Sequence, residues 1–460
     1  MEPLFSNDAI VLGILIVVLA IIFYTSSSND QLFKKFYTYV PALLLCYFVP
    51  AILHYPLGLI APEWYGPELL EFLKTKNISM PPGMSFNEIS EFLDEAGLTS
   101  ETKGFIGKSK LYFVASRYLL PASLVLLCLS IDFKGIINLG PKAIIMFLTA
   151  TFGIIIGGPI ALLVVTNLFP NLIEASPEDV WRGLSTVAGS WIGGGANQTA
   201  MKEIYEVKDN LFATMIVVDV IVANIWMGFL LYGASVTEKI DGFLKSDTSA
   251  IEALKEKVKS YREGIERIPT MTDAFVMLAV AFGATAVAHW GADVIVPIMN
   301  SFEETLASLR LNSLMSPFFW LIVICTTLGL LLSFTKFRKL EGVGASRWGS
   351  VFIYILVATI GMKMNVGEIW KNLGLFAIGG IWMFIHVIIL LTVAYLIKAP
   401  FFFVAVGSQA NVGGAASAPI VASAFSPALA PVGVLLAVLG YAAGTYGAII
   451  CAMLMQGVVN

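Results

Sequence analysis

The chain has 460 residues, of which 57% are hydrophobic and 13% are charged, with a formal net charge of −4 and a mean hydropathy of +0.82. A soluble protein of this length could not bury so much apolar surface, so the composition excludes that class and indicates a membrane protein. The charge balance shows no basic run, and we expect no nucleic-acid partner. The four cysteines lie in apolar segments without metal-ligand spacing and are interpreted as small core residues.

Long apolar runs predict an all-α polytopic membrane protein. Residues 8–24 lack the basic start and the cleavage site of a signal peptide, so we interpret them as a retained first span. The predicted spans, in chain order, are 8–24, 38–60, 111–131, 142–168, 209–235, 272–298, 314–334, 347–362, 372–397 and 427–456. Two further segments, 183–201 and 403–423, are apolar but rich in Gly, Ala and Ser, and we call them the two glycine-rich segments.

Two long loops separate the spans. The segment "SFNEISEFLDEAGL" in loop 61–110 starts with Ser85 and Glu88 in capping-box spacing, which predicts a short surface helix. The loop 237–271 contains "SAIEALKEKVKSYREGIER", which predicts a solvated helix of mixed charge.

The basic loops set the predicted orientation. "QLFKKF" (31–36) and "FTKFRKLEG" (334–342) fall on the same, cytoplasmic side only if each glycine-rich segment enters and leaves on one side. Both termini then lie outside the cell, the glycine-rich segments are re-entrant hairpins, and a bacterial inner (cytoplasmic) membrane is the expected location.

An ordered series of features occurs twice. Asn138-Leu139-Gly140 and Asn372-Leu373-Gly374 each precede a long span, then a glycine-rich segment that begins Gly-Ser, then a closing span. The predicted topology places the two turns on opposite sides, so the units are inverted structural repeats of about five spans and one hairpin each. This is the architecture of many secondary transporters. The predicted parts are scaffold spans 1–60, an extracytoplasmic loop 61–110, a core half 111–236, a cytoplasmic linker 237–271, scaffold spans 272–335 and a core half 336–460.

The glycine-rich segments carry the predicted binding residues. Each interior Gly costs a helix about 1 kcal/mol against Ala, so the clusters predict broken helices whose exposed backbone can bind a polar solute. Pro419 is expected to break the second segment. The hairpin-tip glycines are Gly193, Gly194, Gly195, Gly413 and Gly414, and the candidate substrate-binding residues are Ser190, Asn197, Gln198, Thr199, Ser408, Gln409, Asn411, Ser417 and Thr445.

Asp219 is the candidate ion-coupling residue, because it lies deep within the span "MIVVDVIVANIW". A charge at the bilayer centre costs some 2.5–3.5 kcal/mol on insertion scales, so such residues usually have a function. Asp219 could bind Na⁺ or carry a proton, with Asn224 nearby, or it could form a buried ion pair with Arg117. The histidines, at 54, 289 and 386, are interpreted as hydrogen-bonded interior residues.

The segments "AGSWIGGGANQTAM", "VGSQANVGGAASAPIVA" and "GYAAGTYGA" resemble the YjcL-like membrane proteins of domain of unknown function 819, over nearly the whole chain. That family is distantly similar to the superfamily of cation/proton antiporters and anion transporters, which includes sodium–glutamate and bile-acid symporters. The resemblance implies an elevator-type transporter that is a homodimer. The first tip lacks the Gly-Gly-His-Gly pattern of the glutamate carriers, so the resemblance does not imply glutamate as the substrate.

These observations favour a secondary active transporter of a small polar or anionic organic solute, driven by a Na⁺ or H⁺ gradient. A monovalent cation/proton antiporter is the alternative, followed by a channel. No H-E-x-x-H, G-x-S-x-G or Walker motif occurs, so we do not expect an enzyme. We expect no cofactor apart from Na⁺ as a coupling ion. The solute stays open among carboxylates, sugars and peptide-like compounds.

Overall fold

The computed structural model forms two compact units, residues 1–117 with 354–366 and residues 118–353 with 367–460. The structure describes residues 2–40, 42–81, 84, 86–169, 172–173, 175–246, 268–308, 312–364, 374–426 and 429–459. The predicted mixed-charge helix between positions 249 and 267, the capping residue Ser85 and the pair Asn372-Leu373 lie outside the described residues.

The first unit contains apolar helices and a small segment with a core of its own. Its elements are α1 (Asp8–Ser26), α2 (Gln31–Tyr39), α3 (Ala42–His54), β1 (Glu63–Tyr65), α4 (Glu68–Thr75), α5 (Phe86–Glu95), α6 (Thr99–Thr102), η1 (Lys103–Phe105), β2 (Ile106–Lys108) and α7 (Leu111–Val114). Helix α1 begins after Asn7, whose side chain accepts a hydrogen bond from the amide of Ala9 at 2.8 Å.

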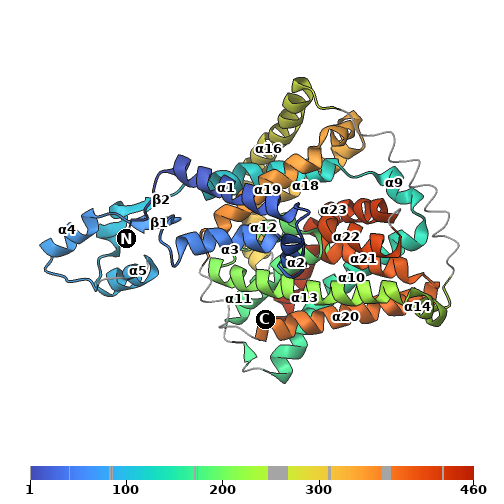
Figure 1. Cartoon of the computed structure of the whole chain (residues 1–460). Helices are drawn as coiled ribbons and strands as arrows, with labels where there is room; N and C mark the ends of the chain where they lie inside the picture. Colours follow the sequence, from blue (N-terminus) through green and yellow to red (C-terminus); the bar gives the residue numbers. More distant parts are fainter. Residues whose placement is uncertain are drawn as a thin grey trace. The chain divides into compact units, whose positions relative to one another are not determined.

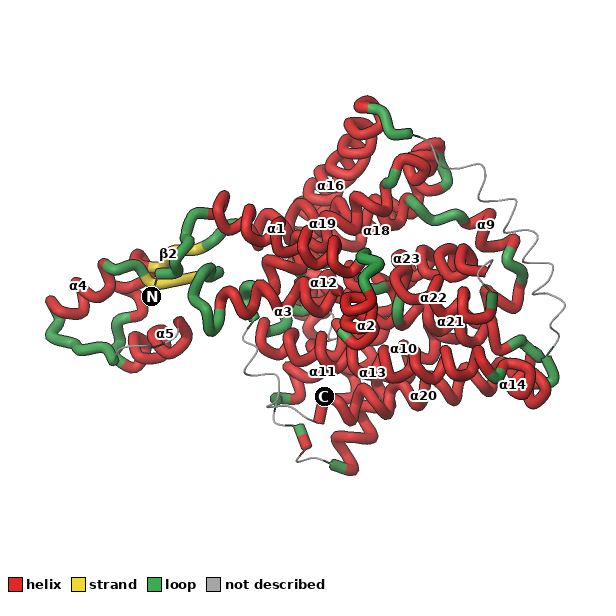
Figure 2. Tube along the Cα trace, in the orientation of Figure 1, coloured by secondary structure: helices red, strands yellow, loops and turns green. Residues whose placement is uncertain are grey.

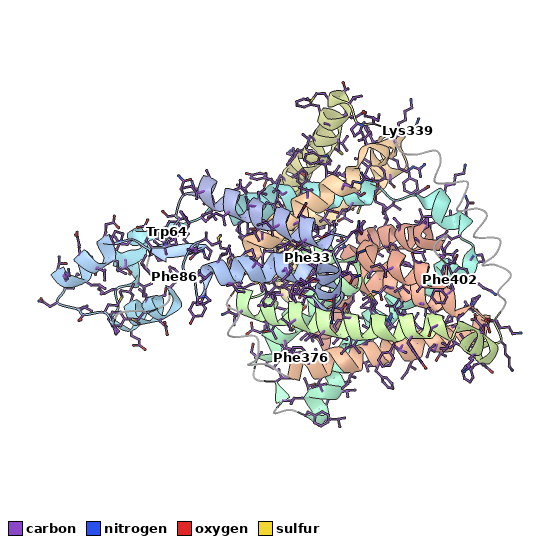
Figure 3. All side chains as sticks on the ribbon, viewed as in Figure 1. Phe33, Trp64, Phe86, Lys339, Phe376 and Phe402 are labelled. Atoms are coloured by element: carbon purple, nitrogen blue, oxygen red, sulfur yellow. The ribbon has the colours of Figure 1, made fainter. Side chains whose placement is uncertain are left out.

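The predicted loop 61–110 folds around a hydrophobic cluster of its own. Strands β1 and β2 pair antiparallel, with Trp64 opposite Gly107, and a Cβ at position 107 would collide with the indole ring. Trp64 and Phe86, the first residue of α5, are labelled in Figure 3. The cluster consists of Tyr65, Leu69, Leu73, Ile89, Leu93 and Leu98. The short helix predicted in this loop is confirmed as α5.

The second unit is almost entirely helical, as Figure 2 shows. After η2 (Ala115–Leu119), which crosses the boundary between the units, its elements are α8 (Leu120–Leu129), α9 (Phe133–Asn138), α10 (Pro141–Leu168), α11 (Pro177–Gly193), α12 (Gly195–Ile204), α13 (Asp209–Ser235), α14 (Thr237–Leu244), α16 (Met271–Asn300), α17 (Glu303–Ser308), η5 (Asn312–Met315), α18 (Pro317–Ser333), η6 (Lys336–Val343), α19 (Ala345–Gly361), α20 (Gly374–Ile397), α21 (Phe401–Val412), α22 (Gly414–Phe425) and α23 (Ala430–Val459). The last residues of α19 belong to the first unit.

Several helix starts follow directly from the sequence. Gly140 adopts a φ of +91°, and Pro141 then opens α10, since proline is tolerated at the first helical position. Thr270 and Asp273 form a capping box at the start of α16. Ser176 caps α11 by accepting a hydrogen bond from the amide of Asp179.

The prediction of an all-α polytopic membrane protein is confirmed. In the described part of the chain, seven helices are long and apolar enough to cross a membrane, or up to nine if each of two bent helix pairs counts as one span. The predicted span 314–334 corresponds to α18, Pro317–Ser333, and the chain bends by 95° between this helix and η6. The predicted span 38–60 contains α3, Ala42–His54, which follows α2 after a bend of 87°.

The first glycine-rich segment is a broken helix pair, α11–α12, which we call the first broken pair. Gly194 separates the helices with a φ of +76°, a conformation that glycine adopts without steric cost. A Cβ at Gly189 would lie 2.6 Å from the carbonyl oxygen of Asn197, so the chain folds back on itself within eight residues. The predicted interruption is confirmed.

The second glycine-rich segment is also a broken helix pair, α21–α22, called the second broken pair. Gly414 has a φ of +58°, and the side chain of Gln409 reaches across the break to Ser417 at 2.7 Å. The expectation that Pro419 breaks the segment is wrong, because this residue lies inside α22. Proline removes a single helical hydrogen bond there, whereas the glycines supply the backbone angles of the turn.

The two broken pairs occupy equivalent places in the chain order. Each follows one long helix and precedes another, in the series α10, α11–α12, α13 and the series α20, α21–α22, α23. Helix α20 packs against α10 and α13, and Figure 1 shows α13 and α20 running side by side.

A glycine face on α10 allows that packing to be close. Trp382 of α20 lies against Gly157 and Gly158, and His386, one turn later, lies against Gly153. The indole nitrogen of Trp382 donates to the carbonyl of Ile154 at 2.8 Å. Small residues on one helix therefore receive the large side chains of the other.

The break in the first pair predicts a strong effect of a single methyl group. A Cβ at Gly193 would lie 2.6 Å from the carbonyl of Gly440 and 2.7 Å from the Cα of Gly444. We expect Gly193→Ala to lower the free energy of unfolding by about 1–3 kcal/mol through overpacking. Thermal unfolding of the purified protein in detergent measures the loss.

Gly228 provides the matched control, because a Cβ there would meet no atom within 4 Å. Gly228→Ala should leave the melting temperature unchanged or raise it, since alanine favours helix. Equal melting temperatures for the two variants would contradict the tight packing at Gly193.

Candidate functional site

Asp219 is buried on α13 and receives three hydrogen bonds from the first broken pair. Ser190 Oγ donates to Oδ2 at 2.6 Å, Trp191 Nε1 donates to Oδ1 at 2.7 Å, and Gln198 Nε2 donates to Oδ2 at 3.0 Å. Ser190 and Trp191 belong to α11 and Gln198 belongs to α12, so both halves of the pair hold the carboxylate.

The polar contacts that Asp219 makes with described residues are all with neutral donors. A buried carboxylate without a cation is costly unless hydrogen bonds replace its water shell. Three donors satisfy both oxygens, so the site can hold the negative charge. A carboxylate in this setting can also take up a proton or a monovalent cation.

Asn197 fixes the first broken pair to α23. Its Nδ2 donates to the carbonyls of Gly193 at 3.1 Å and Tyr441 at 3.0 Å, and its Oδ1 accepts from Thr445 Oγ1 at 2.5 Å. Thr445 also contacts Thr326 Oγ1 of α18 at 3.2 Å. The amide of Asn197 is therefore satisfied within the protein.

Asn411 fixes the second broken pair to α10 in the same manner. Its Nδ2 donates to the carbonyls of Gly407 at 2.9 Å and Phe147 at 3.2 Å, and its Oδ1 accepts from Thr151 Oγ1 at 2.8 Å. In both pairs the asparagine bonds to the glycine four residues before it and accepts from a threonine on a neighbouring long helix.

This equivalence is encoded in a short sequence pattern. Residues 193–197 read "GGGAN" and residues 407–411 read "GSQAN", so Gly-x-x-Ala-Asn occurs once in each pair. In each pair the asparagine Nδ2 donates a hydrogen bond to the carbonyl of the glycine four residues earlier.

Ser408 joins the second broken pair to two other helices. Its Oγ lies 2.8 Å from Trp226 Nε1 of α13 and 2.8 Å from His386 Nε2 of α20. An indole N–H can only donate, so Ser408 accepts from Trp226 and its own proton is free to reach His386.

Helix α13 therefore contacts both broken pairs through one face. Asp219 binds the first pair and Trp226 binds the second, and their separation of seven positions corresponds to about two helical turns. A displacement of either pair relative to α13 changes a hydrogen bond at that face.

An aromatic contact connects the first broken pair to α20. The rings of Trp191 and Trp382 have centroids 5.1 Å apart. Trp382 lies one turn before His386, which contacts Ser408. The first pair, α20, the second pair and α13 thus form a continuous ring of side-chain contacts.

Other sequence-predicted site residues make local contacts. Thr199 donates to carbonyls of its own helix, those of Gly195 and Ala196. The Nδ2 of Asn224 donates to the carbonyl of Val220 in its own helix at 2.8 Å, rather than to Asp219. The Oγ of Ser417 accepts a hydrogen bond from Gln409 Nε2.

Some residues of this network were not predicted from the sequence, namely Thr151, Trp191, Trp226, Thr326 and Trp382. His386 was predicted only as a hydrogen-bonded interior residue. A signal existed for Trp226, which has the helical spacing that places it on the face of Asp219. The threonine contacts had no local signal, because they join helices far apart in the chain.

The fold and the site together define a polytopic helical membrane protein with two broken helix pairs, the first of which holds a buried carboxylate. The chain belongs to the family described as "Protein of unknown function (DUF819)", whose model matches residues 96–458. It is similar to the "Uncharacterized membrane protein YjcL" of Bacillus subtilis (strain 168), with 23% identity over 358 residues, 74% of this chain and 82% of the relative. The family resemblance noted from the glycine-rich motifs is confirmed.

The two asparagine anchors give a direct test of the network. Thr445→Val and Thr151→Val keep the side-chain volume but leave a buried asparagine oxygen without its donor. Each should lower the free energy of unfolding by about 1–3 kcal/mol, the cost of an unsatisfied buried acceptor. Thermal unfolding in detergent measures the change.

The exposed Thr392 serves as the control, since its hydroxyl bonds only to the carbonyl of Ile388 in its own helix. Thr392→Val should change stability by less than about 0.5 kcal/mol. A similar small effect at positions 151 and 445 would show that the anchors contribute nothing.

Proposed function

We propose that the protein is a secondary active transporter of a small polar or anionic organic solute, driven by a Na⁺ or H⁺ gradient in a bacterial cytoplasmic membrane. The observation that carries this proposal is the uncompensated carboxylate of Asp219, held by both halves of the first broken pair. Its membrane setting makes the charge costly, and binding of a proton or cation relieves that cost.

The broken pairs support a solute site between them. A Cβ at Gly440 of α23 would lie 2.8 Å from the carbonyl of Ile192 and 3.5 Å from the carbonyl of Ala410, so the two pairs approach the same point on α23. Interrupted helices expose backbone groups that continuous helices consume, and in membranes such breaks occur beside protein or a polar cavity.

Within this site the polar residues have different roles. Asn197 and Asn411 position the broken pairs, since both their amides are engaged by protein groups. Ser190 and Ser408 orient Asp219 and His386 respectively. Gln198 and Gln409 each retain a carbonyl oxygen without a partner among the described residues, which leaves them as the side chains best suited to contact a solute.

An elevator-type mechanism with inverted repeats accounts for the duplicated order of elements. The two core halves, 111–236 and 336–460, would move together and carry the broken pairs across the membrane, while 1–60 and 272–335 would form the scaffold of a homodimer. The repeated series of long helix, broken pair and long helix supports this arrangement.

A monovalent cation/proton antiporter is the second candidate. It is favoured by the three neutral donors around Asp219, which would stabilise the carboxylate after a proton leaves and before a cation arrives. In that case the exchanged ions, rather than an organic solute, would be the cargo.

Thermal stability of the purified protein across Na⁺, K⁺, pH and a panel of small solutes tests the proposal. A ligand at a hundred times its Kd should stabilise the protein by about 2.7 kcal/mol. We expect a sodium- or proton-dependent shift that an organic solute enlarges, and Asp219→Asn should remove the dependence of the shift on the ion. Asp293→Asn, an exposed carboxylate on α16, should preserve the shift.

The alternatives give different results in the same experiment. A response to cations without any response to solutes would favour the antiporter. Loss of the shift in both carboxylate variants would contradict the assigned role of Asp219. A stability that no ion or solute changes would overturn the transport proposal.

A further inference from the structure

The side-chain amide of Gln198 has two different environments at its two ends. Its Nε2 donates to Asp219 Oδ2 at 3.0 Å, whereas its Oε1 is buried and has no hydrogen-bond partner among the described residues. The residue is 0% exposed. Buried polar atoms are normally paired, so an unpaired oxygen next to an ionisable group calls for a functional explanation.

The charge of Asp219 fixes which end of the amide faces it. An ionised carboxylate only accepts hydrogen bonds, so it selects the NH₂ end of Gln198. A protonated carboxyl donates a hydrogen bond, and it then selects the carbonyl end. Rotation of the amide by half a turn about its terminal torsion exchanges the two ends, with the glutamine backbone unchanged.

The neighbouring donors determine where the proton would be carried. Trp191 Nε1 can only donate and contacts Oδ1, so that oxygen remains an acceptor. The proton therefore belongs on Oδ2, the oxygen that faces Gln198 and Ser190. Gln198 Oε1 is the acceptor that lacks a partner, and rotation satisfies it.

We propose that Gln198 is a proton-dependent amide switch that presents an acceptor oxygen to the solute when Asp219 is ionised and a donor NH₂ when Asp219 is protonated. The inference rests on the proposed transport function and names its substrate class. The protonated site binds a carboxylate or a similar acceptor group, so the proton and an anionic solute bind together.

Other ionisable groups on the neighbouring helices are engaged elsewhere. Lys202, one turn after Gln198 on α12, pairs with Asp209 of α13 at 2.9 Å. His386 of α20 contacts Ser408, and Asp241 of α14 accepts from the amide of Phe401. Helices α21 and α22 carry no ionisable side chain.

The remaining ionisable groups on the helices that pack around Asp219 lie at other positions along those helices. The charged residues of α11 lie in its first turns, at 178, 179 and 182, well before Ser190. The ionisable side chains of α8, α18 and α23 are all cysteines or tyrosines. Gln198 and Ser190 are therefore the hydrogen-bond partners of Asp219 Oδ2 that respond to its proton.

Gln409 supplies an internal control of the same residue type. It is 1% exposed, its Oε1 also lacks a partner among the described residues, and its Nε2 donates to Ser417 Oγ at 2.7 Å. A serine hydroxyl does not change charge in the accessible pH range, so the Gln409 amide should keep one orientation.

The Asp219→Asn variant should hold the Gln198 amide in the orientation expected beside a protonated Asp219. Trp191 requires an acceptor on its side of residue 219, so the asparagine must place its oxygen there and its NH₂ toward Gln198. Gln198 then has to accept, and its own NH₂ faces the solute at every pH. This variant therefore separates anion binding from protonation.

The first experiment measures the melting temperature of the purified full-length chain with acetate, lactate and succinate as carboxylate probes, from acidic to alkaline pH. The wild type should respond at acidic pH and lose the response as pH rises. Asp219→Asn should respond at all pH values, Gln198→Met should respond at none, and Thr392→Val, at an exposed hydroxyl outside the site, should keep the pH dependence of the wild type. A pH-dependent response in Gln198→Met would overturn the proposal.

The second experiment does not depend on a ligand. Solid-state NMR measures the distance between Gln Nε2 and Asp Cγ, with Gln198→Met identifying the signal. The short distance should be present at alkaline pH and lost at acidic pH. A short distance at both pH values would overturn the switch, whereas failure of every probe and ion in the melting experiment would overturn the transport function instead.

Discussion

The structure depends on the requirement that a carboxylate inside a membrane protein must be hydrogen-bonded on both oxygens. Asp219 meets this requirement through Ser190, Trp191 and Gln198, which come from both halves of one broken helix. A continuous helix could not place residues 190 and 198 around one carboxylate, because they would lie about 12 Å apart along its axis. The glycine break and the buried charge therefore explain each other.

The same logic extends to the second broken pair, with a neutral network in place of a charge. Ser408 links Trp226 and His386, and Trp226 lies on the face of α13 that carries Asp219. Asparagine–threonine bonds attach each pair to a long helix of the other series, Asn197 to α23 and Asn411 to α10. Protonation, solute contact and movement of the broken pairs would thus act on one connected set of hydrogen bonds.

Much of the fold could be predicted because its signals are local. Apolar runs of at least 18 residues identified the long helices, and glycine clusters identified both breaks. Predictions failed where tertiary packing changes the path of the chain. The run 38–60 contains a helix of 13 residues, α3, that starts after a bend from α2, and Pro419 continues a helix because Gly414 already provides the turn. The small hydrophobic core of loop 61–110 was not predicted, because an amphipathic helix does not show by itself which partner it packs against.

The sequence by itself determined the membrane class, the positions of the two breaks and the identity of the buried acid, since hydropathy, glycine content and charge are properties of short segments. Only the tertiary structure decided which groups surround Asp219 and which anchor the asparagines. Those partners are separated by 28 positions for Trp191 and Asp219, and by 248 for Asn197 and Thr445. Such pairings arise from the packing of whole helices, and the placement of the Gln198 amide beside Asp219 follows from that packing rather than from any local pattern.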